Sequence, residues 1–76
     1  MYNYQRLREL RESSNKTQSD IAETLATRRQ QYARWENGEQ ELPMHHFITL
    51  AKFYNVSLDY LAGLIDIPEP LERAGS

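Results

Sequence analysis

Residues 17–38, TQSDIAETLATRRQQYARWENG, contain the pattern that decides the fold of this chain. They predict two short helices joined by a tight turn. Thr17 is placed to cap the first helix, and Asp20 follows three residues later as in a capping box. Apolar side chains then recur at helical spacing and predict a buried stripe formed by Ile21, Ala22 and Leu25.

The second helix of the pair is predicted over residues 28–37. At about 100° per residue, Tyr32, Trp35 and Glu36 share one face, which we expect to be buried. Gly38 stops the helix, because glycine readily adopts the left-handed conformation that ends helices. Polar side chains project from the first turn and from the face opposite the aromatic rings, namely Arg28, Arg29, Gln30, Arg34 and Asn37.

This outer face carries side chains that pair with the base edges of DNA. Arginine donates two hydrogen bonds to O6 and N7 of guanine, and glutamine pairs similarly with N6 and N7 of adenine. Both residues are also good helix formers, so a solvated surface helix is the alternative interpretation. Gln18 favours DNA, because it lies on the first turn of the preceding helix, whose dipole attracts phosphate. We therefore predict a helix that enters the major groove.

Charge is unevenly distributed along the chain. The formal net charge of -2 at first argues against nucleic acid, since neutralised phosphates supply most sequence-independent affinity. Residues 1–34 nevertheless hold seven Lys and Arg against four Asp and Glu, whereas residues 35–76 hold two against seven. The basic half contains the predicted helix pair, and we expect its Lys16 to contact phosphate.

The rest of the sequence predicts three further helices and no strand. One covers residues 3–13 with Asn3 as its cap, and another follows a Ser57 cap and ends near Gly63. The helix over residues 44–54 has an apolar stripe that we expect to be buried, formed by Met44, Phe47, Ile48, Ala51 and Tyr54. The fold is therefore predicted to be all-α, with five helices.

Several classes of site are not expected. The chain has no cysteine, and His45 and His46 point about 100° apart without a third ligand, so we expect no metal or other cofactor. Neither a nucleophile elbow nor a glycine-rich nucleotide loop occurs, so we expect no enzyme. No apolar run approaches the roughly 18 residues that span a bilayer, and the opening residues are unlike a signal peptide. We expect a cytoplasmic protein without membrane contact.

The length of 76 residues predicts a single domain. We place this domain at residues 1–65. Residues 66–76 include Pro68 and Pro70 and are predicted to form a flexible C-terminal tail.

Taken together, these motifs resemble those of the phage-repressor and Cro-type helix-turn-helix family, often called XRE-like. The resemblance runs over residues 7–64 and is carried by Arg11, Thr17-Gln18, Ile21-Ala22, Glu36-Asn37-Gly38 and residues 55–61. It implies a compact five-helix, lambda-repressor-like DNA-binding domain. It further implies a transcriptional repressor that binds a palindromic operator in double-stranded DNA as a homodimer.

The resemblance also implies roles for particular residues. By position, base contacts would come from Gln18, Arg29, Gln30 and Arg34, and a phosphate or base-edge contact from Arg28. Arg11 and Glu36 match an ion pair that ties the first helix to the third. Helical periodicity independently places Glu36 on an inward face, where an unpaired carboxylate would be costly, so a partner is expected.

Two positions around the turn depart from the family pattern. Ala26 stands where a turn glycine is common, so either this alanine adopts a less favourable backbone or the turn differs. Arg28 occupies the usual place of a capping Ser or Thr and cannot cap. We therefore predict that Thr27 caps the third helix, with Gln30 as its capping-box partner.

The segment after Gly38 is a third departure. Glu39, Gln40 and Glu41 stand where many relatives place Lys or Arg against phosphate, which weakens the expected phosphate contact. The acidic half of the chain also supports a different function, a protein-binding module such as an antitoxin-like or anti-repressor partner of a basic protein. The arginines of the third helix argue for DNA, and a protein that does both is compatible with the sequence.

Apolar residues near both ends exceed what a small core needs. They are Tyr2, Tyr4, Phe53, Tyr54, Tyr60, Leu64, Ile65 and Ile67. Some of them can complete the core. The sharper hypothesis is a dimer interface formed by the fifth helix and the segment after it, which would separate two recognition helices by about 34 Å, one turn of DNA.

Overall fold

The computed structural model describes residues 2–64 as five α-helices, and no strand occurs among these residues. The helices are α1 (Gln5–Ser13), α2 (Gln18–Thr24), α3 (Arg29–Glu36), α4 (Met44–Tyr54) and α5 (Leu58–Leu61). The predicted all-α, five-helix fold is confirmed. The tail predicted at residues 66–76, and the interface residues Ile65 and Ile67, lie outside the described residues.

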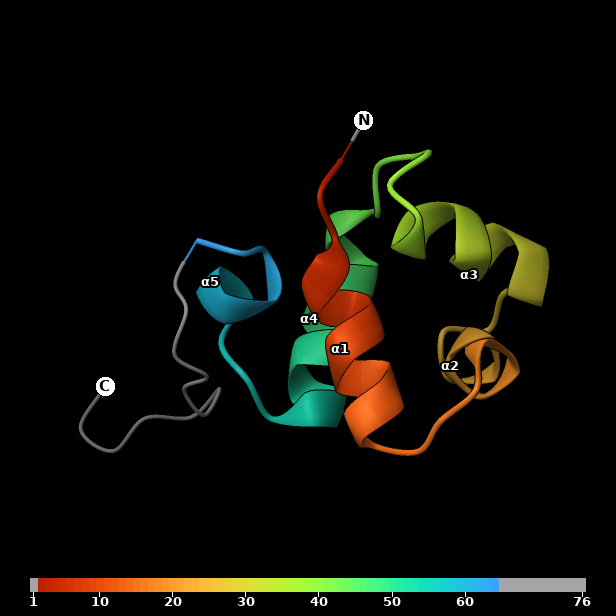
Figure 1. Ribbon diagram of the computed structural model, residues 1–76, viewed down its shortest axis with the longest axis horizontal. Coiled ribbons are helices and arrows are strands. Elements are labelled where there is room, and N and C mark those ends of the chain that lie inside the picture. The colour runs from red at the N-terminus through yellow and green to blue at the C-terminus, as the bar shows by residue number, and fades with distance from the viewer. Residues whose placement is uncertain (1, 65–76) are drawn as a thin grey trace.

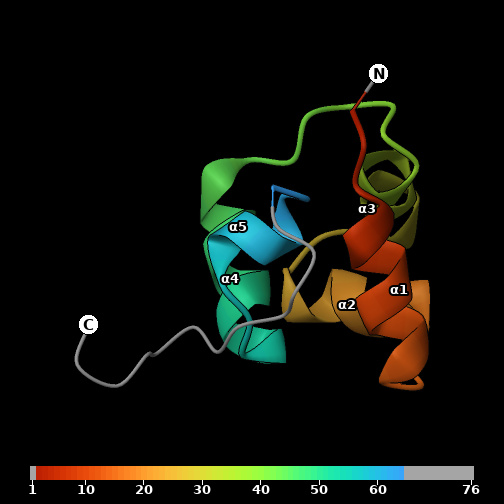
Figure 2. The ribbon, with the colours of Figure 1, turned by 60° about the vertical axis from the view of Figure 1, so that its left-hand side comes forward.

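The helices surround one core (Figures 1 and 2). In Figure 1, α5 lies on one side of α1 and α4, and the pair α2 and α3 lies on the other side. Helix α1 contacts both α3 and α5, so it joins the two sides. The largest fully buried side chains come from all five helices and are Leu7, Ile21, Tyr32, Leu50 and Leu61.

The polar caps of α2 and α5 are those the sequence predicts. The Thr17 hydroxyl accepts a hydrogen bond from the Asp20 N–H at 3.1 Å, and the Asp20 carboxylate accepts one from the Thr17 N–H at 2.9 Å. Both halves of the capping box are therefore present. The Ser57 hydroxyl accepts from the Tyr60 N–H at 3.1 Å and caps α5.

Each of the five helices is followed, within two residues of its end, by a residue with positive φ. These residues are Asn15, Ala26, Gly38, Asn55 and Gly63. After α3, the Gly38 N–H donates to the Trp35 carbonyl and the Glu39 N–H to the Arg34 carbonyl, as in a Schellman motif. Ala26 has φ 57°, so the less favourable backbone conformation expected there is the alternative that occurs.

The predicted cap of α3 by Thr27 is wrong. The Thr27 N–H donates to the Ala22 carbonyl at 2.9 Å, so Thr27 still belongs to the turn that closes α2. Arg28 has an extended backbone and takes the N-cap position, but its side chain makes no capping hydrogen bond. Gln30 consequently has no capping-box partner. The N-cap residue of α1 is likewise Tyr4, although the Asn3 Oδ1 accepts from the Gln5 N–H at 3.3 Å.

The buried face of α4 was only partly predicted. Ala51 is buried, and Phe47 and Tyr54 pack against the core, but Met44 is 64% exposed and Ile48 is 40% exposed. Leu50, which the predicted stripe omitted, is fully buried. The helix is rotated about its axis relative to the prediction, because its core-facing side is centred between Leu50 and Phe47.

The N-terminal segment holds the loop that connects α3 to α4. The Tyr2 N–H donates to the Gly38 carbonyl at 3.0 Å, and the buried Tyr4 hydroxyl accepts from the Leu42 N–H at 3.1 Å. The Tyr4 ring also packs edge-on against Phe47. A Cβ atom at Gly38 would collide with the Tyr2 carbonyl, so glycine allows this close approach.

Candidate nucleic-acid interface

Helix α3 presents two chemically different faces. Tyr32 is fully buried, and Trp35 and Glu36 are nearly so. The polar residues predicted to read DNA, Arg28, Arg29, Gln30, Arg34 and Asn37, are all exposed. Within residues 2–64, the side chains of Arg28, Gln30 and Arg34 form no hydrogen bond or ion pair. Gln30 and Arg34 are thus available on the outer face of α3, and Arg28 is available at its N-cap.

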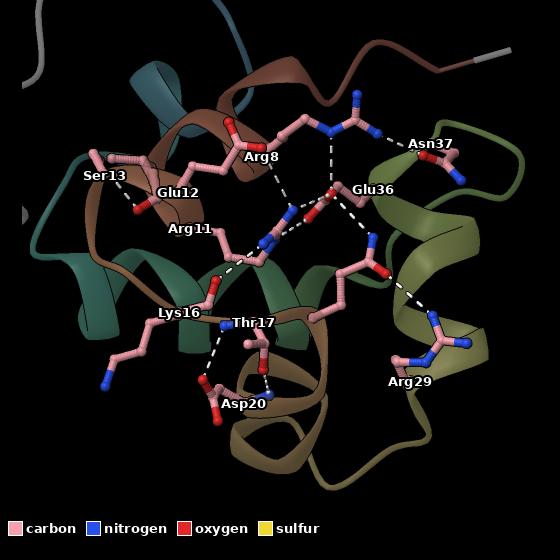
Figure 3. A network of polar contacts seen from close by, with 12 residues as sticks. Arg8, Arg11, Glu12, Ser13, Lys16, Thr17, Asp20, Arg29, Glu36 and Asn37 are labelled. Atoms are coloured by element: carbon pink, nitrogen blue, oxygen red, sulfur yellow. Dashed lines mark hydrogen bonds and ion pairs between the residues drawn. The ribbon is translucent and has the colours of Figure 1, made fainter.

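The inner face of α3 is anchored by a network centred on Glu36 (Figure 3). Arg11 Nε lies 2.8 Å from Glu36 Oε2, and Arg11 Nη2 lies 3.2 Å from Oε1. The ion pair that the resemblance implies is therefore present. Arg11 Nη1 also donates to the Lys16 carbonyl at 3.0 Å, so the same guanidinium holds the segment between α1 and α2. The exposed Lys16 side chain leaves this segment close to α2.

Gln18 links α2 to two residues of α3. Its Nε2 donates to Glu36 Oε1 at 3.2 Å, and its Oε1 accepts from Arg29 Nη1 at 3.3 Å. Gln18 and Arg29, both predicted to contact DNA, are thus joined to each other. Because the amide uses one donor and one acceptor internally, it retains one N–H and one lone pair for another group.

Arg8 is a member of the network that the sequence analysis missed. Its Nε lies 3.2 Å from Glu36 Oε1, and its Nη2 donates to the Asn37 Oδ1 at 2.7 Å. The spacing between Arg8 and Arg11 was an available signal, since residues three apart share one side of a helix. Asn37, predicted to face DNA, is therefore oriented from α1.

The Glu36 carboxylate is charged despite its burial. Burial raises its pKa, but the hydrogen bonds from Arg11, Gln18 and Arg8 outweigh that effect, and the pKa is lowered overall. The hydroxyl of Tyr32 is buried near this carboxylate without reaching it in hydrogen-bond geometry. Burial also raises the pKa of the Tyr54 hydroxyl, to about 12, so this phenol stays neutral.

The loop after α3 carries negative charge. Gln31 Nε2 of α3 donates to Gln40 Oε1 at 2.6 Å, which ties the loop to the helix. Within residues 2–64, neither Glu39 nor Glu41 forms an ion pair or a hydrogen bond through its carboxylate. Both side chains are exposed.

His45 and His46 lie in the first turn of α4. Their rings are 4.0 Å apart, and the His46 ring is 4.9 Å from that of Trp35. Burial, followed by the neighbouring His45, lowers the pKa of His46. These contacts fix Trp35 in the packing between α3 and α4, as expected of a core residue. None of the helices described in residues 2–64 is long and apolar enough to cross a membrane.

Comparison with known proteins gives two findings. Residues 4–67 match the family described as helix-turn-helix domain. A curated relative, the uncharacterized HTH-type transcriptional regulator YobD of Bacillus subtilis (strain 168), is 36% identical over 66 residues. The aligned region covers 87% of this chain and 59% of the relative, so the chain spans about three fifths of that protein. No solved structure matches the chain.

Proposed function

We propose, since the chain belongs to the helix-turn-helix domain family, that it regulates transcription by inserting α3 into the major groove of double-stranded DNA. The observation that carries this proposal is the contrast between the two faces of α3. Its inner face is fixed by the Glu36 network, while Arg28, Gln30 and Arg34 have no partner within residues 2–64. A rigid helix with free donors is what direct readout of bases requires.

The proposed contacts divide into two kinds. Gln30 and Arg34, on the outer face, would pair with base edges, and Arg29 would reach a base from the first turn. Gln18 would contact both Arg29 and the DNA, because its Oε1 accepts a hydrogen bond from Arg29 and its amide keeps one N–H for the DNA. Contacts with phosphate would come from Lys16, Arg28 and Asn37, and these set the position of the domain rather than its sequence preference.

We extend the proposal to a repressor of the phage-repressor and Cro type, or XRE-like class. Such a protein would bind a palindromic operator as a homodimer, with half-sites about 10 base pairs apart. Exposed apolar side chains near the end of the described chain support self-association, since Leu58 is 37% exposed and Leu64 is 75% exposed. Two such surfaces would meet around a two-fold axis.

The test is selection from random duplexes at about 100 mM salt, where phosphate contacts still contribute. We expect enrichment of a palindromic sequence. Arg34→Ala should relax the preference at one base position in each half-site, at a cost of about 1–3 kcal/mol in discrimination. The control is Lys52→Ala, which removes a positive charge from the far end of α4 and should leave the selected sequence unchanged.

A second function is favoured by one observation, the unpaired Glu39 and Glu41. A protein-binding module, such as an antitoxin-like or anti-repressor partner, would present these carboxylates to a basic protein. If the folded chain enriched no sequence, or if Arg34→Ala and the parent selected the same sequences with equal strength, DNA readout by α3 would be wrong. That outcome would favour the protein-binding function.

A further inference from the structure

The acidic loop, residues 39–41, is distinguished by its position, because it directly follows α3 and carries two carboxylates. Four of the eight carboxylates within residues 2–64 are engaged: Glu9 with Arg6, Glu12 with Arg11, Asp20 in the cap of α2, and Glu36 in its network. Glu39 and Glu41 are exposed and have no such partner in that range. Two uncompensated negative charges therefore stand directly after the helix proposed to enter DNA.

Three contacts fix the acidic loop beside α3. The Glu39 N–H donates to the Arg34 carbonyl at 2.9 Å, which places Glu39 at the end of the helix. Gln31 holds Gln40 through a side-chain hydrogen bond of 2.6 Å. The Tyr2 N–H holds the Gly38 carbonyl at 3.0 Å. Because these contacts anchor Gly38, Glu39 and Gln40, the backbone that carries both carboxylates stays beside α3.

The acidic loop and α2 lie on opposite flanks of α3. Gln31 holds the loop, whereas Arg29 faces Gln18 of α2, and at about 100° per residue these two positions of α3 are some 200° apart. The exposed Gln30 and Arg34 lie between them around the helix. In Figure 1 the loop rises above the C-terminal end of α3, while α2 lies below the helix.

A helix in the major groove is flanked by two phosphate strands. The groove is about 12 Å wide, and charges interact over roughly 8–10 Å at moderate salt. Charges on each flank of α3 therefore interact mainly with the phosphates of the nearer strand. On the α2 flank, the helix pair presents Lys16, Arg28 and Arg29. On the other flank it presents Glu39 and Glu41. One DNA strand would therefore face positive side chains, and the other strand would face negative side chains.

On the basis of the proposed function, we propose that Glu39 and Glu41 repel the DNA backbone on their flank of α3. The domain then holds its site through the backbone beside α2 and through base contacts alone. The repulsion weakens binding to every duplex by a similar factor, because every duplex carries the same phosphates. Base contacts from α3 are then needed for the protein to remain bound, which keeps it off random DNA.

The first experiment compares Glu39→Gln/Glu41→Gln with the parent on the selected duplex and on a random duplex. We expect the double variant to bind both duplexes roughly three- to tenfold more tightly at about 50 mM salt. The gain should shrink toward none at about 300 mM, because salt screens the repulsion. Glu9→Gln is the control, since it removes an exposed carboxylate on α1, outside both the helix pair and α5. It should bind as the parent does.

The second experiment uses duplexes in which single phosphates of the selected site are replaced by neutral methylphosphonates. Neutralising phosphates on the strand beside α2 should weaken binding. Neutralising those beside the acidic loop should strengthen binding by the parent, and the double variant should show no such gain. Thermal unfolding of each variant checks that the fold is kept.

Failure of this inference is distinguishable from failure of the proposed function. A parent that selects no DNA sequence overturns the proposed function itself. A parent that selects a sequence, with the double variant binding like Glu9→Gln, overturns only the repulsion by Glu39 and Glu41. A gain confined to the selected duplex would also overturn it, because that result would indicate a base contact.

Discussion

Ala26 is the one residue with a Cβ atom, other than two asparagines, that adopts a positive φ within residues 2–64. Asparagine tolerates this region because its short side chain forms local hydrogen bonds, whereas alanine has no such compensation. The conformation costs an L-residue about 1–2 kcal/mol. The turn of the helix pair therefore contains a strained position, and it is the position where the sequence departs from glycine.

Ala26→Gly should stabilise the protein. Glycine removes the steric cost, although its greater freedom in the unfolded chain offsets part of the gain, which leaves about 0.5–1 kcal/mol. Urea unfolding followed by circular dichroism measures the change. Ala33→Gly is the control, because the same substitution inside α3 should destabilise by about 1 kcal/mol. An Ala26→Gly protein no more stable than its parent would show that the turn is not strained.

At the scale of the element, the end of α3 depends on another part of the chain. Gly38 closes the helix at φ 78° and also lies against the Tyr2 backbone. Gly63 closes α5 at φ 85°, but a Cβ there would meet no atom within 4 Å. The two glycines therefore separate the cost of backbone strain from the cost of a steric collision.

Gly38→Ala should destabilise the protein more than Gly63→Ala. The substitution at Gly63 costs only backbone strain, about 1 kcal/mol, whereas the substitution at Gly38 also displaces Tyr2 and breaks its hydrogen bond. We expect a total above about 2 kcal/mol for Gly38→Ala. Thermal and urea unfolding of both variants measure the difference. Equal losses would mean that the contact with Tyr2 contributes nothing.

The elements were predicted from signals that act over a few residues. The capping box of Thr17 and Asp20, the Ser57 cap and the stop at Gly38 depend only on near neighbours, so the sequence contains them. The face of α4 was harder to predict. Apolar residues cover more than half of the circumference of this helix, and only the position of its neighbours leaves Met44 exposed and buries Leu50.

On the scale of the whole molecule, Glu36 joins three helices, because Arg8 and Arg11 reach it from α1 and Gln18 from α2. Its side chain is fully buried. Removal of one partner from a buried ion pair typically costs about 3–5 kcal/mol, a large fraction of the stability of a small domain. This residue is therefore a point on which the arrangement of α1, α2 and α3 depends.

Glu36→Gln should lower stability at pH 7 by about 3 kcal/mol and reduce its dependence on pH. The folded pKa of Glu36 is lowered from its ordinary value of 4.5, so its contribution is fully present above pH 4.5. This contribution is lost as the pH falls through the folded pKa. The difference between parent and variant, measured by urea unfolding, should therefore shrink below pH 4.5.

Glu23→Gln serves as the control for this pH series. Glu23 is exposed on α2 and has no partner within residues 2–64, so its loss should change stability little at any pH. Asp20, whose pKa is lowered by its hydrogen bonds with Thr17, titrates in all three proteins and cancels in the comparison. A gap between parent and Glu36→Gln that stayed constant down to pH 3 would contradict the assignment.

The candidate site was predictable in part. The outer face of α3 follows from helical periodicity, and the pair of Arg11 and Glu36 came from the family resemblance rather than from the spacing of residues. The second arginine, Arg8, and the bridge from Gln18 to Arg29 depend on how α1 and α2 pack against α3. The periodicity of one helix does not predict which of its residues come close to residues of another helix. The residues assigned to DNA remain predictions until binding is measured.

The pairing of Tyr2 with Gly38 has a practical consequence for handling this protein. A segment fused before Tyr2 would begin beside the last turn of α3, on the side of the domain that DNA would approach. A purification tag at that end would crowd the surface proposed to bind DNA, and a polyhistidine tag would add charge that changes with pH. Binding measurements should therefore use a tag at the opposite end, or one that is cleaved off cleanly.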